Sequence, residues 1–80
     1  MDETKSIDEL DTVVLLNDIE EEGLERGDIG TVVHRYDDAD ACEVEFVTGE
    51  GDTVAILTLG LDDIRPMDRR EILHARTLAA

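Results

Sequence analysis

The sequence predicts an all-β fold, in which five short strands close into a small barrel and a short C-terminal helix follows. Three observations lead to this expectation. The chain has 80 residues, a length that suits one domain with a small core. Short apolar or alternating runs recur at close spacing between turn-forming residues, which is typical of small barrels. Gly23, Gly27 and Gly30 lead directly into a β-branched run, as in the first long hairpin of such barrels.

The first predicted strand follows an acidic N-terminal segment. Residues 1–10 are polar and acidic, and we expect them to be flexible. Residues 11–17 form a short apolar run ended by turn formers, which favours a strand. Residues 18–27 then make an acidic connection, and its apolar Ile19 and Leu24 should hold it against the barrel.

The approach to the second predicted strand, residues 29–36, requires special backbone geometry. Gly27 and Gly30 stand where a tight turn needs a positive φ or where another segment comes close to the backbone. A phosphate-binding loop is the rival interpretation. The segment lacks the lysine of such loops and enters a strand rather than a helix, so turn geometry is favoured.

The third strand has the clearest pattern in the chain. Residues 37–40 form an aspartate-rich turn, and residues 41–48 then alternate between apolar and acidic side chains. The apolar face consists of Cys42, Val44 and Phe46. Glu43 and Glu45 project from the opposite, outer face, where Arg35 of the preceding strand could pair with them.

The last two strands and their connections complete the barrel, which we expect to span residues 11–66. Residues 49–52 are a hairpin turn, and residues 53–59 form the returning strand. One short helical turn at residues 60–63 leads to a final strand at residues 64–66, where a proline ends it. Five strands with such short connections describe an SH3-like barrel.

Residues 67–80 are predicted to form a helical tail. Asp68 and Glu71 have the spacing of a capping box, with aspartate in place of the usual Ser or Thr. The apolar face of this helix would consist of Ile72, Ala75 and Ala79. Because a helix of about ten residues is marginal alone, it should dock either on the barrel or on a second copy of the chain, which would give a homo-oligomer.

The charge of the chain is strongly acidic and unevenly distributed. With 22 Asp and Glu against 7 Lys and Arg, the formal net charge is −15. Residues 1–34, 35–64 and 65–80 carry −9, −8 and +2. Such a field opposes binding to phosphate backbones and anionic lipids and favours a basic protein partner. The basic tail could fold back on the acidic body or form a separate contact surface.

No combination of residues indicates catalysis, a cofactor or a metal. His34, His74 and Cys42 match no metal-ligand spacing, and we interpret Cys42 as a buried structural thiol without an activating base. Asp37, Asp38 and Asp40 do not fit a calcium-binding loop. We therefore expect a protein that is not an enzyme. The acidic start, the short apolar runs and the single cysteine predict a cytoplasmic location.

Several segments in order resemble a known family, the small bacterial proteins catalogued as domain of unknown function 4926. The matching segments, within about residues 9–67, are Gly23-Leu24, Gly27-Asp28-Ile29-Gly30-Thr31-Val32-Val33, Glu43-Val44-Glu45-Phe46-Val47, Leu57-Thr58-Leu59 and Ile64-Arg65-Pro66. The resemblance implies an SH3-like barrel and no established activity. Members are often stand-alone proteins encoded beside other short genes, which suggests a partner. Residues 27–33 also look like a KOW element, without its basic residues.

These observations predict a non-catalytic, acidic protein–protein interaction module, which binds a basic partner encoded nearby in the manner of an antitoxin or immunity protein. The candidate partner-binding residues are Asp37, Asp38, Asp40, Glu43, Glu45, Arg69, Arg70, Ile72 and Arg76. Two alternatives remain at this point. One is an accessory or regulatory subunit of an enzyme such as a nitrile-hydratase-type complex, and the other is a KOW-like nucleic-acid-binding module acting through the basic tail.

Overall fold

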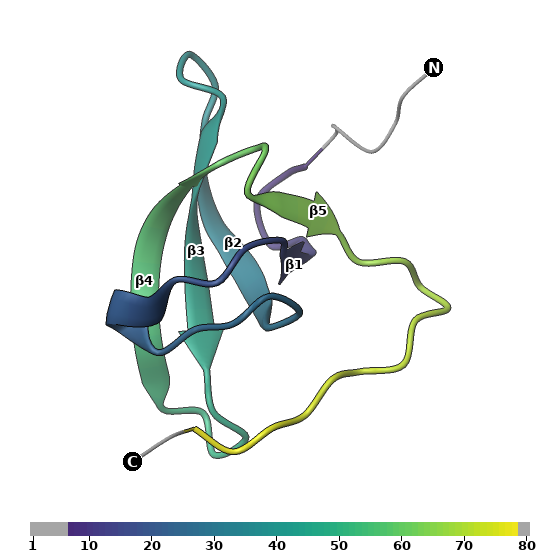
Figure 1. The fold of residues 1–80 in the computed structure, drawn as a ribbon. Coiled ribbons are helices and arrows are strands. Elements are labelled where there is room, and N and C mark those ends of the chain that lie inside the picture. The colour runs from purple at the N-terminus through teal and green to yellow at the C-terminus, as the bar shows by residue number, and fades with distance from the viewer. Residues whose placement is uncertain (1–6, 79–80) are drawn as a thin grey trace.

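The computed structural model describes residues 7–78 and contains one antiparallel sheet of five strands (Figure 1). The strands are β1 (Thr12–Leu15), β2 (Ile29–Tyr36), β3 (Ala41–Val47), β4 (Thr53–Gly60) and β5 (Ile64–Pro66). They lie side by side in the order β4-β3-β2-β1-β5. Each strand falls within two residues of its predicted range, so the all-β part of the expected fold is confirmed.

The alternation in β3 places its apolar face in the core, as predicted. Cys42 and Val44 are completely buried, and Phe46 is 3% exposed. Aliphatic side chains supply nearly all of the remaining core. The buried cluster consists of Ile7, Val13, Leu15, Leu24, Val32, Cys42, Val44, Phe46, Ala55, Leu59 and Ile64. A core this small predicts a modest free energy of unfolding of about 3–5 kcal/mol.

The sheet does not close into a barrel, and that part of the prediction is wrong. β4 and β5 are the two edge strands, and each pairs with a single neighbour, β3 and β1 respectively. β5 is only three residues long and ends at Pro66, which has no backbone N–H to donate. No strand pairing joins β5 to β4 in the described part of the chain, so the sheet stays open between these two strands (Figure 1).

The acidic connection between β1 and β2 packs against the sheet, as its two apolar residues predict. Ile19 and Leu24 form an isolated β-bridge, and Leu24 is 3% exposed. A single 3-10 turn (Glu20–Glu22) lies between them. The helical turn predicted at residues 60–63 is instead a tight turn, in which the Asp63 N–H donates to the Gly60 carbonyl at 2.9 Å.

Gly27, just before β2, and Gly30, its second residue, have the backbone roles predicted for them: a positive φ and a close approach of another segment. Gly27 has φ = 96°, a left-handed conformation that a side chain would strain. Gly30 lies against the core strand β3, and a Cβ added there would come within 2.5 Å of Val44 Cγ1 and 2.9 Å of Phe46 Cε1. These glycines therefore serve the backbone turn and the close packing of β2 on β3.

The packed part of the chain begins earlier than residue 11. Ile7 is 1% exposed and is among the largest fully buried side chains. The Leu10 N–H donates to the Val32 carbonyl at 2.7 Å, which ties this segment to β2. Ile7 and the Leu10 backbone thus connect this segment to the sheet. Residues 1–6 lie outside the described residues.

The predicted C-terminal helix is absent from residues 67–78, which instead form an extended strap that leaves β5 and passes around the sheet (Figure 1). Part of the predicted cap does form, because the Asp68 N–H donates to Glu71 Oε1 at 2.7 Å. The same carboxylate, however, is held by Arg65, and no helix continues from it. Ile72 is 93% exposed, so it does not form the expected apolar face. Residues 79–80 lie outside the described residues.

Candidate functional site

The two glutamates predicted on the outer face of β3 lie there, each bound by a neighbouring hydroxyl. Tyr36 Oη donates to Glu43 Oε1 at 3.3 Å, and Thr53 Oγ1 donates to Glu45 Oε2 at 2.6 Å. Burial and the charge of Glu43 raise the pKa of Tyr36, which keeps the phenol a donor. Within residues 7–78 neither glutamate has a basic side chain at ion-pair distance. The face therefore presents unneutralised acidic charge.

Arg35 does not pair with these glutamates, and the reason is a change of register. A β-bulge between Val32 and His34 inserts one residue into β2. Because side chains alternate between the two faces, this extra residue moves Arg35 to the core face, opposite Cys42. Its guanidinium Nη1 donates to the Ile7 carbonyl at the rim of the core. Arg35 therefore secures the N-terminal segment.

Two acidic turns meet at one end of the sheet. The β2–β3 turn carries Asp37, Asp38 and Asp40, and the β4–β5 turn carries Asp62 and Asp63. A hydrogen bond of 3.0 Å from the Leu61 N–H to the Asp40 carbonyl joins the two turns. An open, shallow hollow lies between them, lined by Asp40, Gly60, Leu61, Asp62 and Asp63. We call the five aspartates of these turns the acidic end.

No ion pair neutralises the acidic end in the described part of the chain. None of the ion pairs among residues 7–78 includes any of its five aspartates. Asp37, Asp38, Asp40 and Asp62 are exposed, and Asp63 is half-buried and accepts a 3.3 Å hydrogen bond from the Gly60 N–H. Its negative charge therefore points into solvent from both turns.

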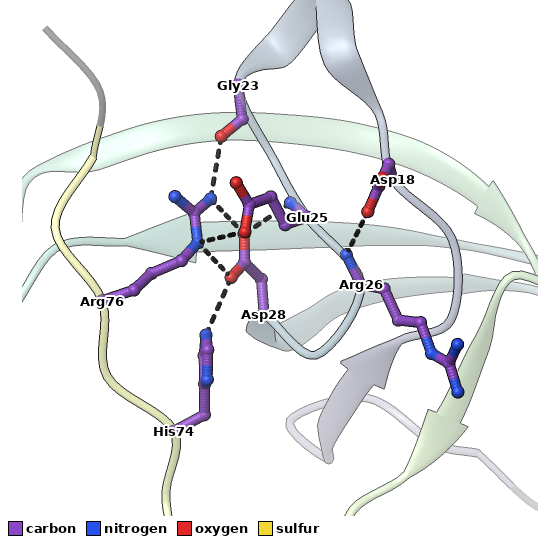
Figure 2. A network of polar contacts seen from close by, with 7 residues as sticks. All are labelled: Asp18, Gly23, Glu25, Arg26, Asp28, His74 and Arg76. Atoms are coloured by element: carbon purple, nitrogen blue, oxygen red, sulfur yellow. Dashed lines mark hydrogen bonds and ion pairs between the residues drawn. The ribbon is translucent and has the colours of Figure 1, made fainter.

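The basic tail is instead anchored at Asp28, at the entrance to β2 (Figure 2). Arg76 binds this carboxylate through two parallel contacts, from Nε to Oδ1 at 2.8 Å and from Nη2 to Oδ2 at 2.7 Å. The same Nη2 donates to the Gly23 carbonyl at 2.9 Å, and His74 Nε2 lies 3.2 Å from Asp28 Oδ1. The Glu25 N–H donates to Oδ2 at 2.8 Å. We call this group of contacts the Asp28 anchor.

Asp28 is ionised in this setting. Its side chain is 10% exposed, and burial alone would raise the pKa of the carboxyl group. The hydrogen bonds from Arg76 and from the Glu25 N–H, the charge of Arg76 and the contact with His74 outweigh that effect, so the pKa of Asp28 lies below its usual value. A paired Arg guanidinium and carboxylate of this geometry are among the stronger polar contacts in proteins.

A second ion pair holds the start of the strap. Arg65 Nη1 and Nη2 donate to the two carboxylate oxygens of Glu71 at 2.8 and 2.6 Å. These bonds lower the pKa of Glu71 to about 2. Together the two pairs engage Arg65 and Arg76, while Arg69, Arg70 and Ile72 remain exposed. The structure therefore does not bring the predicted tail residues together with the predicted turn aspartates.

A comparison with protein-family models shows to which family the chain belongs. The family model described as domain of unknown function (DUF4926) matches residues 9–66. The chain belongs to this family. The resemblance found in the sequence is thereby confirmed. No curated protein and no solved structure matches the chain.

The DUF4926 region contains one half of the Asp28 anchor. Asp28 and the acidic end lie within residues 9–66, whereas Arg76 and His74 lie beyond them. The anchor thus joins the family domain to a tail outside the matched residues. The charge asymmetry of the sequence allows a tail that folds back on the acidic body, but nothing in the spacing of Asp28 and Arg76 indicates their pairing across 48 positions.

The histidines and the cysteine of this DUF4926 protein lie apart. His34 Nδ1 is 3.4 Å from Glu9 Oε2, and His74 contacts Asp28. Cys42 is buried, which raises the pKa of its thiol. Among the residues that the structure describes, no three His, Cys, Asp or Glu side chains are grouped to hold a metal ion. No helix within that same part of the chain is long and apolar enough to cross a membrane.

Proposed function

We propose that this protein is a non-catalytic interaction module that binds a basic segment of another protein at its acidic end. The observation that supports the proposal is the convergence of two acidic turns around an open hollow, with no basic side chain at ion-pair distance in residues 7–78. A basic partner would gain Coulomb attraction there and would be steered to it by the net charge of −15. An antitoxin or immunity protein that covers a basic partner has this character.

The basic charge that neutralises the acidic end would come from the partner rather than from the protein's own tail. Arg65 and Arg76 are bound to Glu71 and Asp28, so Arg69 and Arg70 are the only arginines of residues 65–78 outside an ion pair. This also weakens the alternative of a nucleic-acid-binding tail, which needs several free arginines to contact phosphates. The alternative of an enzyme accessory subunit gains no specific support from residues 7–78.

The test uses a basic probe that forms strands poorly, a fluorescent (Gly-Lys)5 peptide, titrated with the purified chain. We expect binding that weakens steadily as the salt concentration rises from about 50 to 300 mM, because exposed charges are screened over about a Debye length. A (Gly-Glu)5 peptide should not bind. Absence of binding by the lysine peptide at low salt, or binding indifferent to salt, would refute the proposal.

A matched pair of variants locates the contact. Replacing Asp37, Asp38 and Asp40 with Asn removes three charges from the acidic end. Replacing Glu20, Glu21 and Glu22 with Gln removes three charges from the 3-10 turn between β1 and β2. We expect the first variant to bind the lysine peptide several-fold more weakly than the second. Equal losses would show that net charge alone attracts the probe and would contradict the assignment to the acidic end.

A further inference from the structure

The outer edge of β4 has no pairing partner in the described part of the chain. β4 pairs with β3 along one side, and the sheet ends there (Figure 1). Apart from the strand ladder, its backbone hydrogen bonds are confined to Gly60, its last residue. Along the rest of the strand, alternate N–H and C=O groups face outward, where another strand could bind them.

This edge lacks the features that usually prevent strand pairing. Edge strands are commonly short, charged, interrupted by proline or covered by another element. β4 has eight residues, Thr-Val-Ala-Ile-Leu-Thr-Leu-Gly, without a charge or a proline, in a chain that is 36% charged. Its one irregularity lies at the start, opposite Phe46 and Val47, and the pairing is regular from Ala55 to Gly60. An open, uncharged edge of this length is suited to accept an added strand.

Acidic residues at both ends of β4 indicate which strand it would accept. Glu50 and Asp52 precede the strand, and Asp62 and Asp63 follow it. Antiparallel pairing of β4 with β4 of a second copy would set each acidic pair against the other, and like charges directly opposite are destabilising. A strand with basic residues at its two ends would instead find an acidic pair at each end.

We propose that β4 is where this protein receives its partner, by adding to its sheet an extended segment of about eight residues with Lys or Arg at both ends and β-branched residues between them. This inference rests on the proposed function, since it specifies how the basic partner is bound. The backbone ladder would supply affinity, and the basic ends would set orientation and exclude a second copy of the chain.

Backbone-methylated peptides test the inference separately from electrostatics. The probe is Lys-Lys-Val-Thr-Val-Thr-Val-Thr-Lys-Lys, compared with two versions N-methylated either on the three valines or on the three threonines. Both versions keep the charge and the side chains, but each blocks one edge of the peptide strand. We expect one version to bind as the parent does and the other to bind at least about tenfold more weakly, because its methyl groups face β4.

Equal binding of the two methylated peptides would overturn strand addition. If both also bind as well as the unmodified probe, attraction is electrostatic only, and the proposed function still stands. Failure of both this probe and (Gly-Lys)5 would instead remove the proposed function, and the inference with it. The two hypotheses therefore fail in distinguishable ways.

Two single variants provide the control on the protein side. Thr31, Glu45 and Ile56 form one row across β2, β3 and β4, so Thr31→Lys and Ile56→Lys place the same charge on either side of Glu45. Ile56 is 53% exposed and lies on the edge strand, whereas Thr31 lies two strands inward. We expect Ile56→Lys to weaken probe binding at least about fivefold and Thr31→Lys to change it by less than about twofold. Equal effects, or a β4-mediated dimer in sedimentation that Ile56→Lys dissociates, would contradict the inference.

Discussion

Gly30→Ala should destabilise the protein by overpacking the contact between β2 and β3. The added Cβ would lie 2.5 Å from Val44 Cγ1, 2.9 Å from Phe46 Cε1 and 3.1 Å from the Glu45 carbonyl oxygen. Carbon atoms in contact normally lie about 3.5–4.0 Å apart, so the methyl group intrudes by about 1 Å. Val44 and Phe46 are 0% and 3% exposed, so both side chains are in the core and must repack there to admit the methyl group.

Extra carbon atoms in a well-packed core typically lower the free energy of unfolding by about 1–3 kcal/mol, and we expect a decrease of about 2 kcal/mol here. In a domain of this size, each kcal/mol shifts Tm by about 4–8 °C, so Tm should fall by about 8–16 °C. Thermal and urea unfolding followed by far-UV circular dichroism measure both quantities. The urea m-value should stay unchanged, because the same surface is exposed on unfolding.

Gly49→Ala provides the matched control, since a Cβ at Gly49 meets no atom within 4 Å and its φ is not in the left-handed region. It should be neutral or stabilising by up to about 1 kcal/mol, through a less flexible unfolded chain. A Gly30→Ala protein as stable as the Gly49→Ala protein would refute the argument, because it would mean that β2 does not approach β3 as closely as the structure shows.

Three further predictions follow from buried or paired side chains. Ile7→Ala should lower the free energy of unfolding by about 2–4 kcal/mol in urea titrations, whereas Leu10→Ala, at a side chain that is 79% exposed, should lower it by less than about 0.5 kcal/mol; similar effects would mean that Ile7 is not in the core. Because Arg65 lowers the pKa of Glu71 to about 2 in the folded state, the stability that this pair contributes is present above about pH 5 and is lost as the pH falls toward 2. The urea midpoints of the natural chain and of Glu71→Gln should therefore converge on acidification, and a constant gap would contradict the pairing. Cys42, fully buried and with a raised pKa, should react with a thiol reagent at least about a hundredfold faster in urea than in the native state, and fast native reaction would show that the sheet opens readily.

The strands could be predicted because their signals are local. In β3 the side chains alternate with period two, and each apolar residue of the pattern is buried. Turn-forming residues mark the ends of the neighbouring strands. Gly27 and Gly30 mark positions that need a positive φ or a close approach of the backbone. Closure of the sheet is not local, because it depends on whether the arrangement of all five strands brings the two edge strands, β4 and β5, together, and there the prediction failed.

The candidate site was predictable only in its charge. The acidic turns are visible as runs of aspartate, but their meeting at one end of the sheet follows from the pairing of β3 with β4. Arg35 was predicted on the wrong face of β2, because a bulge moves every residue after it to the opposite face. No residue of β2 indicates that bulge in the sequence. The tail helix was wrongly predicted because the capping-box spacing is satisfied without a helix: Glu71 accepts both the Asp68 N–H and the Arg65 guanidinium, and the exposed Ile72 provides no packed apolar face.

The position of β1 inside the sheet has a consequence for the order in which the protein forms during its synthesis. β2, β3 and β4 are consecutive hairpins, so they can pair as soon as they emerge from the ribosome. β1, although made first, keeps one side unpaired until β5 emerges, and the Asp28 anchor waits for Arg76, 48 residues after its partner. Long-range pairing of this kind slows folding. β5 is therefore the last strand to join the sheet, and until it pairs the nascent chain exposes the edge of β1, whose Val13, Val14 and Leu15 are buried in the finished fold, in place of the edge of β5.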